Sequence, residues 1–181
     1  MKVLGFAGSL RAASFNRGLL RAAVELAPAG MEIETFDIAG IPPFNQDHEA
    51  QPPEAVKEFK ARIRAADAIL IATPEYNYSI PGVLKNAIDS ASRPYGDNPF
   101  DGKPVAVMGA SIGALGTARA QYHLRQSFVF LNMLPLNRPE VMVATAEGKF
   151  DAAGRLTDEP TRQRVRELLE ALAAWTKRLS K

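Results

Sequence analysis

Short apolar runs alternate along this chain with longer segments whose apolar residues recur at helical spacing. Residues 3–7, 68–72 and 105–108 are apolar at consecutive positions, a pattern typical of parallel strands buried on both faces. Residues 31–37 show a two-residue alternation that predicts a strand nearer an edge of a sheet. Residues 141–144 predict a fifth strand.

Apolar stripes at helical spacing predict a helix after each of these strands. The expected helices cover residues 19–27, residues 56–66, a segment from Pro81, residues 117–130 and residues 165–179. Pro81 suits a first helical turn, where its missing N–H is no loss. Thr157 or Asp158 is the expected cap of the last helix.

Five strands in alternation with five helices predict an α/β fold with a doubly wound, five-stranded parallel sheet. Right-handed crossovers with one reversal of direction lead to the strand order 2-1-3-4-5, with helices on both faces. Nothing in the composition marks a linker, a repeat or a low-complexity segment. We therefore expect residues 1–181 to form a single domain.

Charge and cysteine content exclude several classes of function. Twenty-two basic and twenty acidic residues give a net charge of +2, and they alternate along residues 54–62 rather than forming the basic face that nucleic acid requires. Cysteine is absent, and His48 and His123 lie far apart in sequence, so no metal site is expected. No run approaches the ~18 apolar residues of a membrane span. The start of the chain lacks the pattern of a signal peptide, so we expect a cytoplasmic location.

The first loop, residues 8–16, follows the first strand and has the chemistry of a phosphate site. The start of a helix offers unpaired N–H groups and a partial positive charge to an anion. Ser9, Ser14 and Asn16 add short polar side chains, and Arg11 adds a guanidinium fork. The loop has neither the Gly-Lys-Ser/Thr ending of a triphosphate site nor the Gly-x-Gly-x-x-Gly of a dinucleotide site, which favours a monophosphate. Ser14 or Asn16 acting only as a helix cap is the alternative.

The second loop, residues 73–82, follows the third strand and combines two prolines with Tyr76, Asn77 and Tyr78. The prolines fix its shape and leave the N–H groups between them free. Flat apolar surface beside amide donors suits a planar heterocycle that has carbonyl groups on one edge. A rigid turn with ordinary aromatic packing is the alternative.

The third loop, residues 109–117, is rich in small residues and allows two interpretations. Glycines there permit close approach of a flat ligand, or simply let a strand turn into a helix. Its Gly-x-Ser-x-Gly sequence around Ser111 also matches the nucleophile motif of serine hydrolases. No acidic residue lies between Ser111 and His123, the one histidine that follows it, so a serine hydrolase is disfavoured.

Together the loops resemble the NADPH-dependent FMN reductase family of flavodoxin-like proteins, which includes quinone, chromate and azo reductases. The matching segments are Gly-Ser-Leu-Arg at residues 8–11 with Ser14 and Asn16, Pro-Glu-Tyr-Asn at residues 74–77 continuing through residues 79–89, and Ala-Ser at residues 110–111 with Gly113 and Gly116, followed by Arg119 and Gln121. The resemblance covers most of the chain. Many of these proteins have glycine where this chain has Tyr78.

The resemblance implies a flavodoxin-like fold and a set of residues that bind FMN. The phosphate and its surroundings would be held by Ser9, Arg11, Ser14, Phe15 and Asn16. The isoalloxazine would meet Pro74, Glu75, Tyr76 and Asn77, and its ring or ribityl chain would meet Ser111 and Gly113. Members of the family are usually dimers or tetramers, so a homodimer or homotetramer is expected.

The expected function is an NAD(P)H-dependent FMN or quinone reductase that works by a two-step exchange. Hydride would pass from NADPH or NADH to flavin N5, the nicotinamide would leave, and a small acceptor such as a quinone, flavin, chromate, azo or nitro compound would take the electrons. No side chain needs to act as a catalytic acid or base. A flavodoxin-type electron carrier that works through protein partners is the alternative, although such carriers are commonly acidic.

Overall fold

The computed structural model describes residues 1–180, and Lys181 lies outside the described residues. Each of the three apolar runs forms a strand. The six strands are β1 (Lys2–Ala7), β2 (Glu32–Phe36), β3 (Ala68–Ala72), β4 (Pro104–Ala110), β5 (Leu134–Pro135) and β6 (Val141–Val143). The α-helices among the described residues are α1 (Phe15–Glu25), α2 (Glu54–Ala65), α3 (Gly82–Ala91), α4 (Ala118–Leu131) and α5 (Glu159–Leu179).

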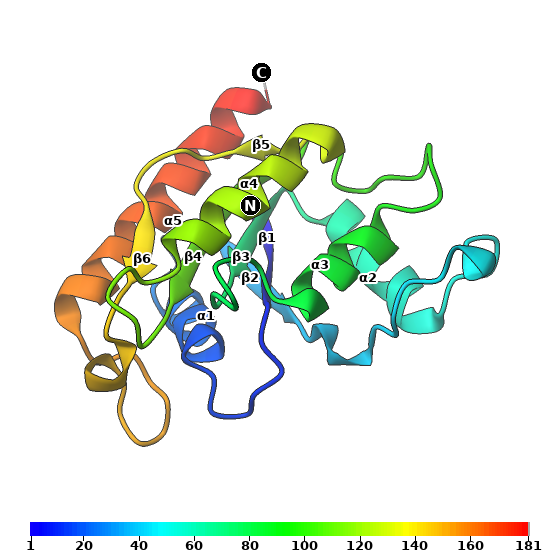
Figure 1. The fold of residues 1–181 in the computed structure, drawn as a ribbon. Helices are drawn as coiled ribbons and strands as arrows, with labels where there is room; N and C mark the ends of the chain where they lie inside the picture. The colour runs from blue at the N-terminus through cyan, green and yellow to red at the C-terminus, as the bar shows by residue number, and fades with distance from the viewer. Residues whose placement is uncertain (181) are drawn as a thin grey trace.

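The strands form one parallel sheet in the order β2-β1-β3-β4-β5, with β6 also paired to β4 (Figure 1). This is the order of flavodoxin-like folds, and it confirms the expected topology. The two-residue alternation of residues 31–37 correctly placed β2 at an edge.

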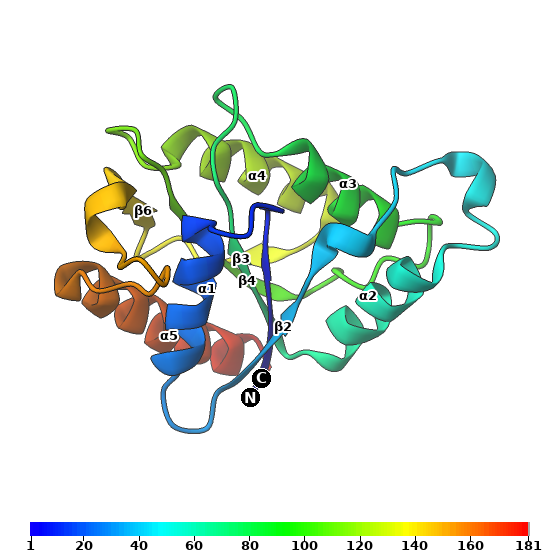
Figure 2. The same ribbon diagram turned by 90° about the horizontal axis from the view of Figure 1, so that it is seen from below.

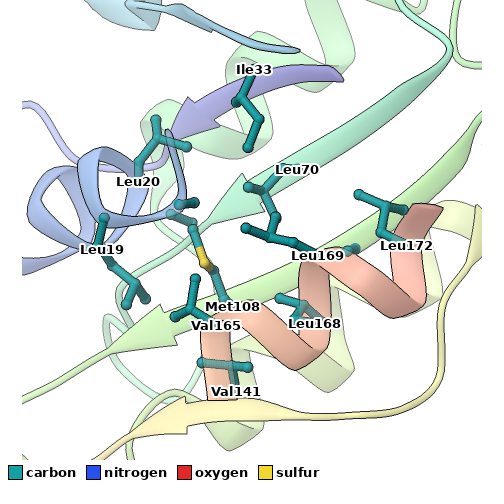
Figure 3. Close-up of a cluster of buried hydrophobic side chains, with 14 of the residues drawn as sticks. Leu19, Leu20, Ile33, Leu70, Met108, Val141, Val165, Leu168, Leu169 and Leu172 are labelled. Carbon is teal, nitrogen blue, oxygen red and sulfur yellow. The ribbon is translucent and has the colours of Figure 1, made fainter. Parts of the chain in front are cut away.

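Alternate side chains of the central strands feed two separate hydrophobic cores, one on each face of the sheet. Helices α1 and α5 cover one face, where Leu19, Leu70, Met108 and Leu169 are buried together (Figure 3). Helices α2, α3 and α4 cover the other face, around Phe59 and its neighbours. Because both faces are covered, every residue of β3 is buried, which explains its continuous apolar run.

The outer strand beside β4 differs from the expectation of a single fifth strand at residues 141–144. Its place is shared by two short pieces: β5 pairs with Pro104 and Val105, and β6 pairs with residues 108–110. Residues 136–140 separate the pieces and include Pro139. At two residues, β5 is too short to show any periodicity, so the sequence pattern could not reveal it.

The start of α5 has the expected cap, whereas α3 begins one residue later than expected. Asp158 caps α5, since its carboxylate accepts the N–H of Thr161 at 3.0 Å. Pro81 stands immediately before α3 rather than within its first turn.

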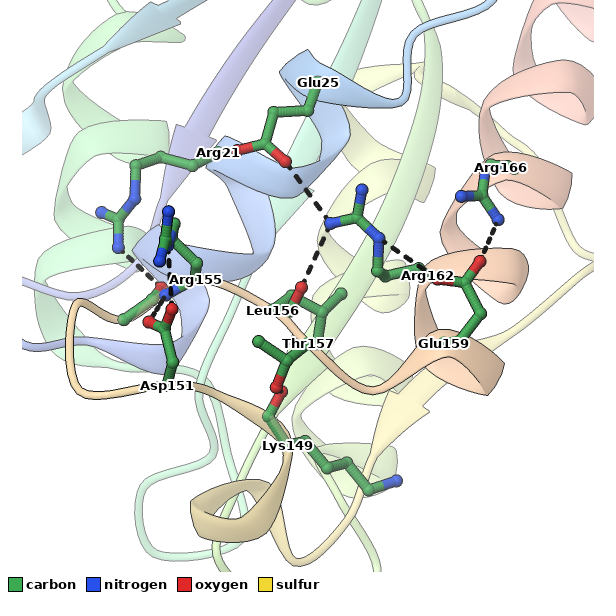
Figure 4. Close-up of polar contacts among 11 residues, drawn as sticks. Arg21, Glu25, Lys149, Asp151, Arg155, Leu156, Thr157, Glu159, Arg162 and Arg166 are labelled. Carbon is green, nitrogen blue, oxygen red and sulfur yellow. Dashed lines mark hydrogen bonds and ion pairs between the residues drawn. The ribbon is translucent and has the colours of Figure 1, made fainter.

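Polar contacts hold the segment between β6 and α5 against α1 (Figure 4). Arg21 donates to the carbonyl of Gly154 at 2.8 Å, and Arg162 lies 3.4 Å from the carboxylate of Glu25. Within the segment, Arg155 Nε donates to Asp151 at 2.8 Å.

None of the helices among residues 1–180 combines the length and the apolar character that a membrane span requires.

Candidate functional site

The first, second and third loops leave the same edge of the sheet. They follow the carboxyl ends of β1, β3 and β4, which run parallel to one another. In Figure 2 β1 runs upward from the N-terminus, and this edge lies toward the top of the view, with the turn after β1, the projecting turn between β3 and α3, and the turn between β4 and α4. The loops therefore meet where parallel α/β sheets bind ligands.

The first loop presents unpaired donors at the start of α1. Ser14 caps the helix, with its hydroxyl accepting the N–H of Arg17 at 3.3 Å. The N–H groups of Phe15 and Asn16 have no protein acceptor within residues 1–180. Ser9 is buried and its hydroxyl makes no hydrogen bond in the same range, while Arg11 is exposed. Free N–H groups at a helix start, beside a serine and an arginine, have the chemistry that an anion site requires.

Two side chains of this loop contact other parts of the protein and are not free to bind a ligand. The amide of Asn16 makes two hydrogen bonds of 2.9 Å with the main chain of Ala110, donating to its carbonyl and accepting its N–H. It thereby joins the first loop to the end of β4, so its predicted part in ligand binding rests on its main-chain N–H. The ring of Phe15 packs on that of Phe150, with centroids 5.1 Å apart.

The sequence analysis did not identify Arg17, whose side chain contacts the main chain of the first loop. Its Nε donates to the carbonyl of Ser9 at 3.0 Å, and its Nη2 contacts the carboxylate of Asp37 at 2.9 Å. Arg17 and Asp37 lie twenty residues apart, on α1 and after β2. No local spacing signals such a pair. The sequence gives one indication of this role. A positive charge in the first turn of a helix is unfavourable with respect to the helix dipole, so Arg17 is expected to have an acidic partner.

The second loop is a tight hairpin. Tyr76 and Ser79 exchange main-chain hydrogen bonds of 3.0 and 2.9 Å. The two residues between them, Asn77 and Tyr78, have φ values of 51° and 65°. Left-handed backbone at both central positions is the geometry of a type I′ turn, in which a tyrosine is strained. The N–H groups of Asn77 and Tyr78 have no acceptor within residues 1–180 and remain available, whereas that of Tyr76 is used.

Glu75 joins the second loop to α4. Its carboxylate accepts the main-chain N–H groups of Arg119 and Ala120 at 3.0 and 3.1 Å, and the Nε of Arg119 at 2.7 Å. This side chain is only 6% exposed. The Arg119 guanidinium in turn lies 3.5 Å from the ring centroid of Tyr78. A stacked cation of this kind offsets part of the strain in the turn.

The third loop begins with a close approach of main chains. A Cβ on Gly109 would lie 2.1 Å from Thr117 Oγ1 and 2.3 Å from the carbonyl of Thr73, so only glycine fits. Ser111 accepts the N–H of Gly113 at 3.1 Å.

The serine hydrolase alternative finds no support in this loop. The Nδ1 of His123 lies 3.0 Å from the hydroxyl of Ser79, and His123 makes no hydrogen bond to Ser111 within the described chain. The relay from base to nucleophile that a serine hydrolase needs is therefore missing here.

An open cleft separates the second and third loops. Its volume is about 760 Å³, including the part open to solvent. Glu75, Asn77, Tyr78, Ser111, Gly113 and Arg119 are among the residues that line it. Its apolar rim is exposed, with Ile112 63% and Leu115 58% accessible. Pro74 is buried beneath the turn, and Tyr76 is exposed on it.

Comparisons with known proteins find relatives that match most of the chain. The profile of the family described as NADPH-dependent FMN reductase matches residues 1–148. The NAD(P)H-dependent FMN reductase PA1204 of Pseudomonas aeruginosa is 57% identical over 180 residues, covering 99% of this chain and 97% of that protein. A 2-hydroxy-1,4-benzoquinone reductase of Burkholderia sp. is 44% identical, covering 98% and 97%. The structure of FerB, a flavoenzyme NAD(P)H:(acceptor) oxidoreductase of Paracoccus denitrificans, has a TM-score of 0.90 at 38% identity, covering 98% and 97%.

Proposed function

Since this chain belongs to the NADPH-dependent FMN reductase family, we propose that it binds FMN and uses NADPH or NADH to reduce quinones or related small acceptors. One observation supports this most directly. Free N–H groups at the start of α1 and the open cleft lie at the same carboxyl edge of the sheet, where Asn16 joins the first loop to the end of β4. A molecule with a phosphate at one end and a flat ring at the other matches both halves.

The residues present fit FMN at each end. Ser9, Arg11 and the N–H groups of Phe15 and Asn16 would bind the phosphate, with Ser14 fixing the helix start. Along the cleft, the ring would meet the second loop through Pro74, Glu75, Tyr76 and Asn77, and the third loop through Ser111 and Gly113. When bound, FMN would supply the redox chemistry that couples NAD(P)H to the acceptor, and these residues would hold and orient it.

The protein itself supplies position and electrostatics. The free N–H groups of Asn77 and Tyr78 would stabilise negative charge on a reduced ring. The carboxylate of Glu75 accepts three hydrogen bonds from α4, so it holds the second loop in place. The predicted contact between Glu75 and the flavin ring stays a prediction, and we assign it to the main chain of Glu75.

The test begins with an absorbance spectrum of the purified protein and its change on anaerobic addition of NADPH. We expect a yellow protein that bleaches and that then reduces a quinone in steady state without any added reductase. Arg11→Ala should weaken FMN binding about tenfold or more, because a charge-assisted hydrogen bond is lost. The control is Lys57→Ala, which removes a cation from the exposed surface of α2. A protein that binds FMN but needs a partner reductase would be a carrier and would refute the enzyme proposal.

We further propose that the protein forms a homodimer or homotetramer. Val129 and Phe130 at the end of α4 are 83% and 72% exposed, and the ring of Tyr95, 71% exposed, lies 6.5 Å from that of Phe130. Large apolar side chains gathered in this way are typical of an interface. Val129→Lys should lower the mass seen by sedimentation, while Val24→Lys, at an exposed valine of α1, should not. A monomeric wild-type protein would refute the proposal.

A further inference from the structure

Tyr78 combines a strained backbone with a position on the cleft between the second and third loops. It lies in the turn that projects between β3 and α3 (Figure 2), and its φ is 65°. Glycine adopts this left-handed backbone freely, whereas a tyrosine there is strained. Strained backbone of this kind concentrates at binding sites, where surrounding contacts hold it in place. Tyr78 is therefore a candidate for a direct role in ligand binding.

The ring of Tyr78 is held by contacts that start from a buried carboxylate. Glu75, whose side chain is only 6% exposed, accepts the Nε of Arg119 at 2.7 Å. This bond fixes the guanidinium, which lies 3.5 Å from the centre of the Tyr78 ring. Stacking of a cation on an aromatic face is favourable. The ring is therefore held in a defined position, although Tyr78 is 66% exposed.

The guanidinium of Arg119 covers one face of this ring and leaves the rest of it accessible. An accessible aromatic face favours a second flat ring, stacked on it or edge-on. Ile112 and Leu115, on the third loop, are also exposed and line the same cleft. The cleft therefore presents an aromatic surface on one loop and aliphatic surface on the other, which suits a flat, apolar molecule.

The charges at the cleft distinguish between the classes of acceptor that the proposed function leaves open. Two charged residues, Glu75 and Arg119, are among the described residues that line it, and they pair with each other. The neighbouring carboxylate repels an anion, so the paired guanidinium attracts an anion less strongly than a free one would. Neither the charge nor the shape of this surface favours an inorganic anion such as chromate.

We infer that Tyr78 is a specificity-determining residue, whose ring stacks on the acceptor and favours neutral planar quinones over inorganic anions. This inference rests on the proposed function, since it concerns the acceptor of that reaction. Each turnover would convert one quinone, one NAD(P)H and one proton into one hydroquinone and one NAD(P)⁺. The Tyr78 side chain neither gives nor takes electrons or protons in this exchange, and it acts through binding alone.

The first experiment measures binding without turnover. Coumarin, a flat and neutral bicyclic carbonyl compound, is equilibrated by dialysis with oxidised protein saturated with FMN, in the absence of NAD(P)H. We expect the wild type and Tyr78→Phe, which keeps the ring, to bind coumarin with similar affinity. Tyr78→Gly removes the ring and keeps the main-chain N–H, and it should bind coumarin about tenfold more weakly.

The second experiment compares two acceptors in steady state, 2-methyl-1,4-naphthoquinone and ferricyanide. The ratio of their kcat/KM values, quinone over ferricyanide, should fall about tenfold in Tyr78→Gly and stay within about twofold of the wild type in Tyr78→Phe. The matched control is Tyr95→Ala. Tyr95 is 71% exposed and has the guanidinium of Arg93 4.2 Å from its ring centre, but it does not line the cleft. This control should keep the wild-type ratio and the wild-type affinity for coumarin.

Several results would overturn the inference. One is equal coumarin affinity, or an equal acceptor ratio, in Tyr78→Gly and wild type; another is an equally large loss in Tyr95→Ala. A Tyr78→Gly protein with a lower sedimenting mass and an unchanged ratio would show that the ring serves contacts between copies instead. If the glycine variant fails to fold, Tyr78→Asn decides the question, because asparagine also tolerates left-handed backbone.

Failure of the inference can be distinguished from failure of the proposed function. A wild type that binds no FMN, or that reduces neither acceptor, would refute the proposed function and the inference with it. A wild type that binds FMN and reduces the quinone with a selectivity independent of Tyr78 would refute the inference alone.

Discussion

Replacing Glu75 by glutamine tests whether one buried carboxylate holds the second loop against α4. The substitution keeps the size of the side chain but removes its charge and one of its two acceptor oxygens. The carboxylate receives two main-chain N–H groups and one guanidinium N–H, all within 3.1 Å. Glutamine must turn its NH₂ group toward one of these donors, because it has a single acceptor.

The expected loss follows from these contacts. A hydrogen bond to a charged group contributes about 1.5–3 kcal/mol, and a negative charge at a helix start contributes about 0.3–1 kcal/mol. The side chain of Arg119 is 37% exposed, so solvent screens its ion pair and we assign that pair little. Oε2 accepts both main-chain N–H groups, so glutamine can keep these two bonds, but they no longer involve a charged acceptor and each loses about 1 kcal/mol. With the charge at the helix start, the expected loss is about 2–3 kcal/mol. For a urea slope of about 2 kcal/mol/M, the midpoint should fall by about 1–1.5 M.

Urea unfolding of the protein without FMN, followed by circular dichroism, measures this effect. The matched control is Glu54→Gln, because Glu54 also lies in the first turn of a helix, yet its side chain is 87% exposed. It should cost less than about 1 kcal/mol. If the two variants unfold within about 0.5 kcal/mol of each other, burial and the three contacts of Glu75 have no special effect, and the reasoning fails.

Three further predictions address other local features. Tyr78→Gly should change the free energy of unfolding by less than about 1 kcal/mol, because relief of the left-handed strain offsets the lost contact with Arg119. Tyr78→Val should cost more, because valine loses the same contact and keeps the strain. Equal costs of the two variants in urea unfolding would contradict this. Asn16→Ala should cost about 2–4 kcal/mol by the same assay, because it leaves a main-chain N–H and C=O at the end of β4 unpaired, and a loss below 1 kcal/mol would refute it. Hydrogen bonds from Thr161 lower the pKa of Asp158, so the carboxylate stabilises the fold above its unfolded pKa and loses this effect as the pH falls through its folded pKa. Asp158→Ala should therefore cost about 1 kcal/mol at pH 7 and clearly less at pH 3, and a loss independent of pH would be inconsistent with this.

The fold was largely predictable because its signals are local. Burial on both faces makes β1, β3 and β4 continuous apolar runs, and the stripe of α5 follows from its single buried side. The two-piece outer strand was not predictable, because β5 exists only through its pairing with Pro104 and Val105. A two-residue strand has no pattern of its own.

The candidate site shows the same division between local and distant interactions. The loops could be located from the sequence, since they follow the strands that the apolar pattern marks. The roles of Asn16 and Glu75 could not, because each side chain bonds to main-chain groups of a distant element, 94 and 44–45 residues away. The sequence indicates which polar residues gather at an edge of the sheet. Only the folded structure shows which of their side chains already bond to other parts of the protein.

The divided outer strand has a consequence for how copies of this protein behave when crowded. A long, regular border of a sheet exposes a row of unpaired N–H and C=O groups on which another chain can add a strand. Here one border is broken into pieces of two and three residues, and the opposite border, β2, presents the exposed acids Glu32 and Glu34. Neither border is a good template, so growth of the sheet from molecule to molecule is discouraged at both ends.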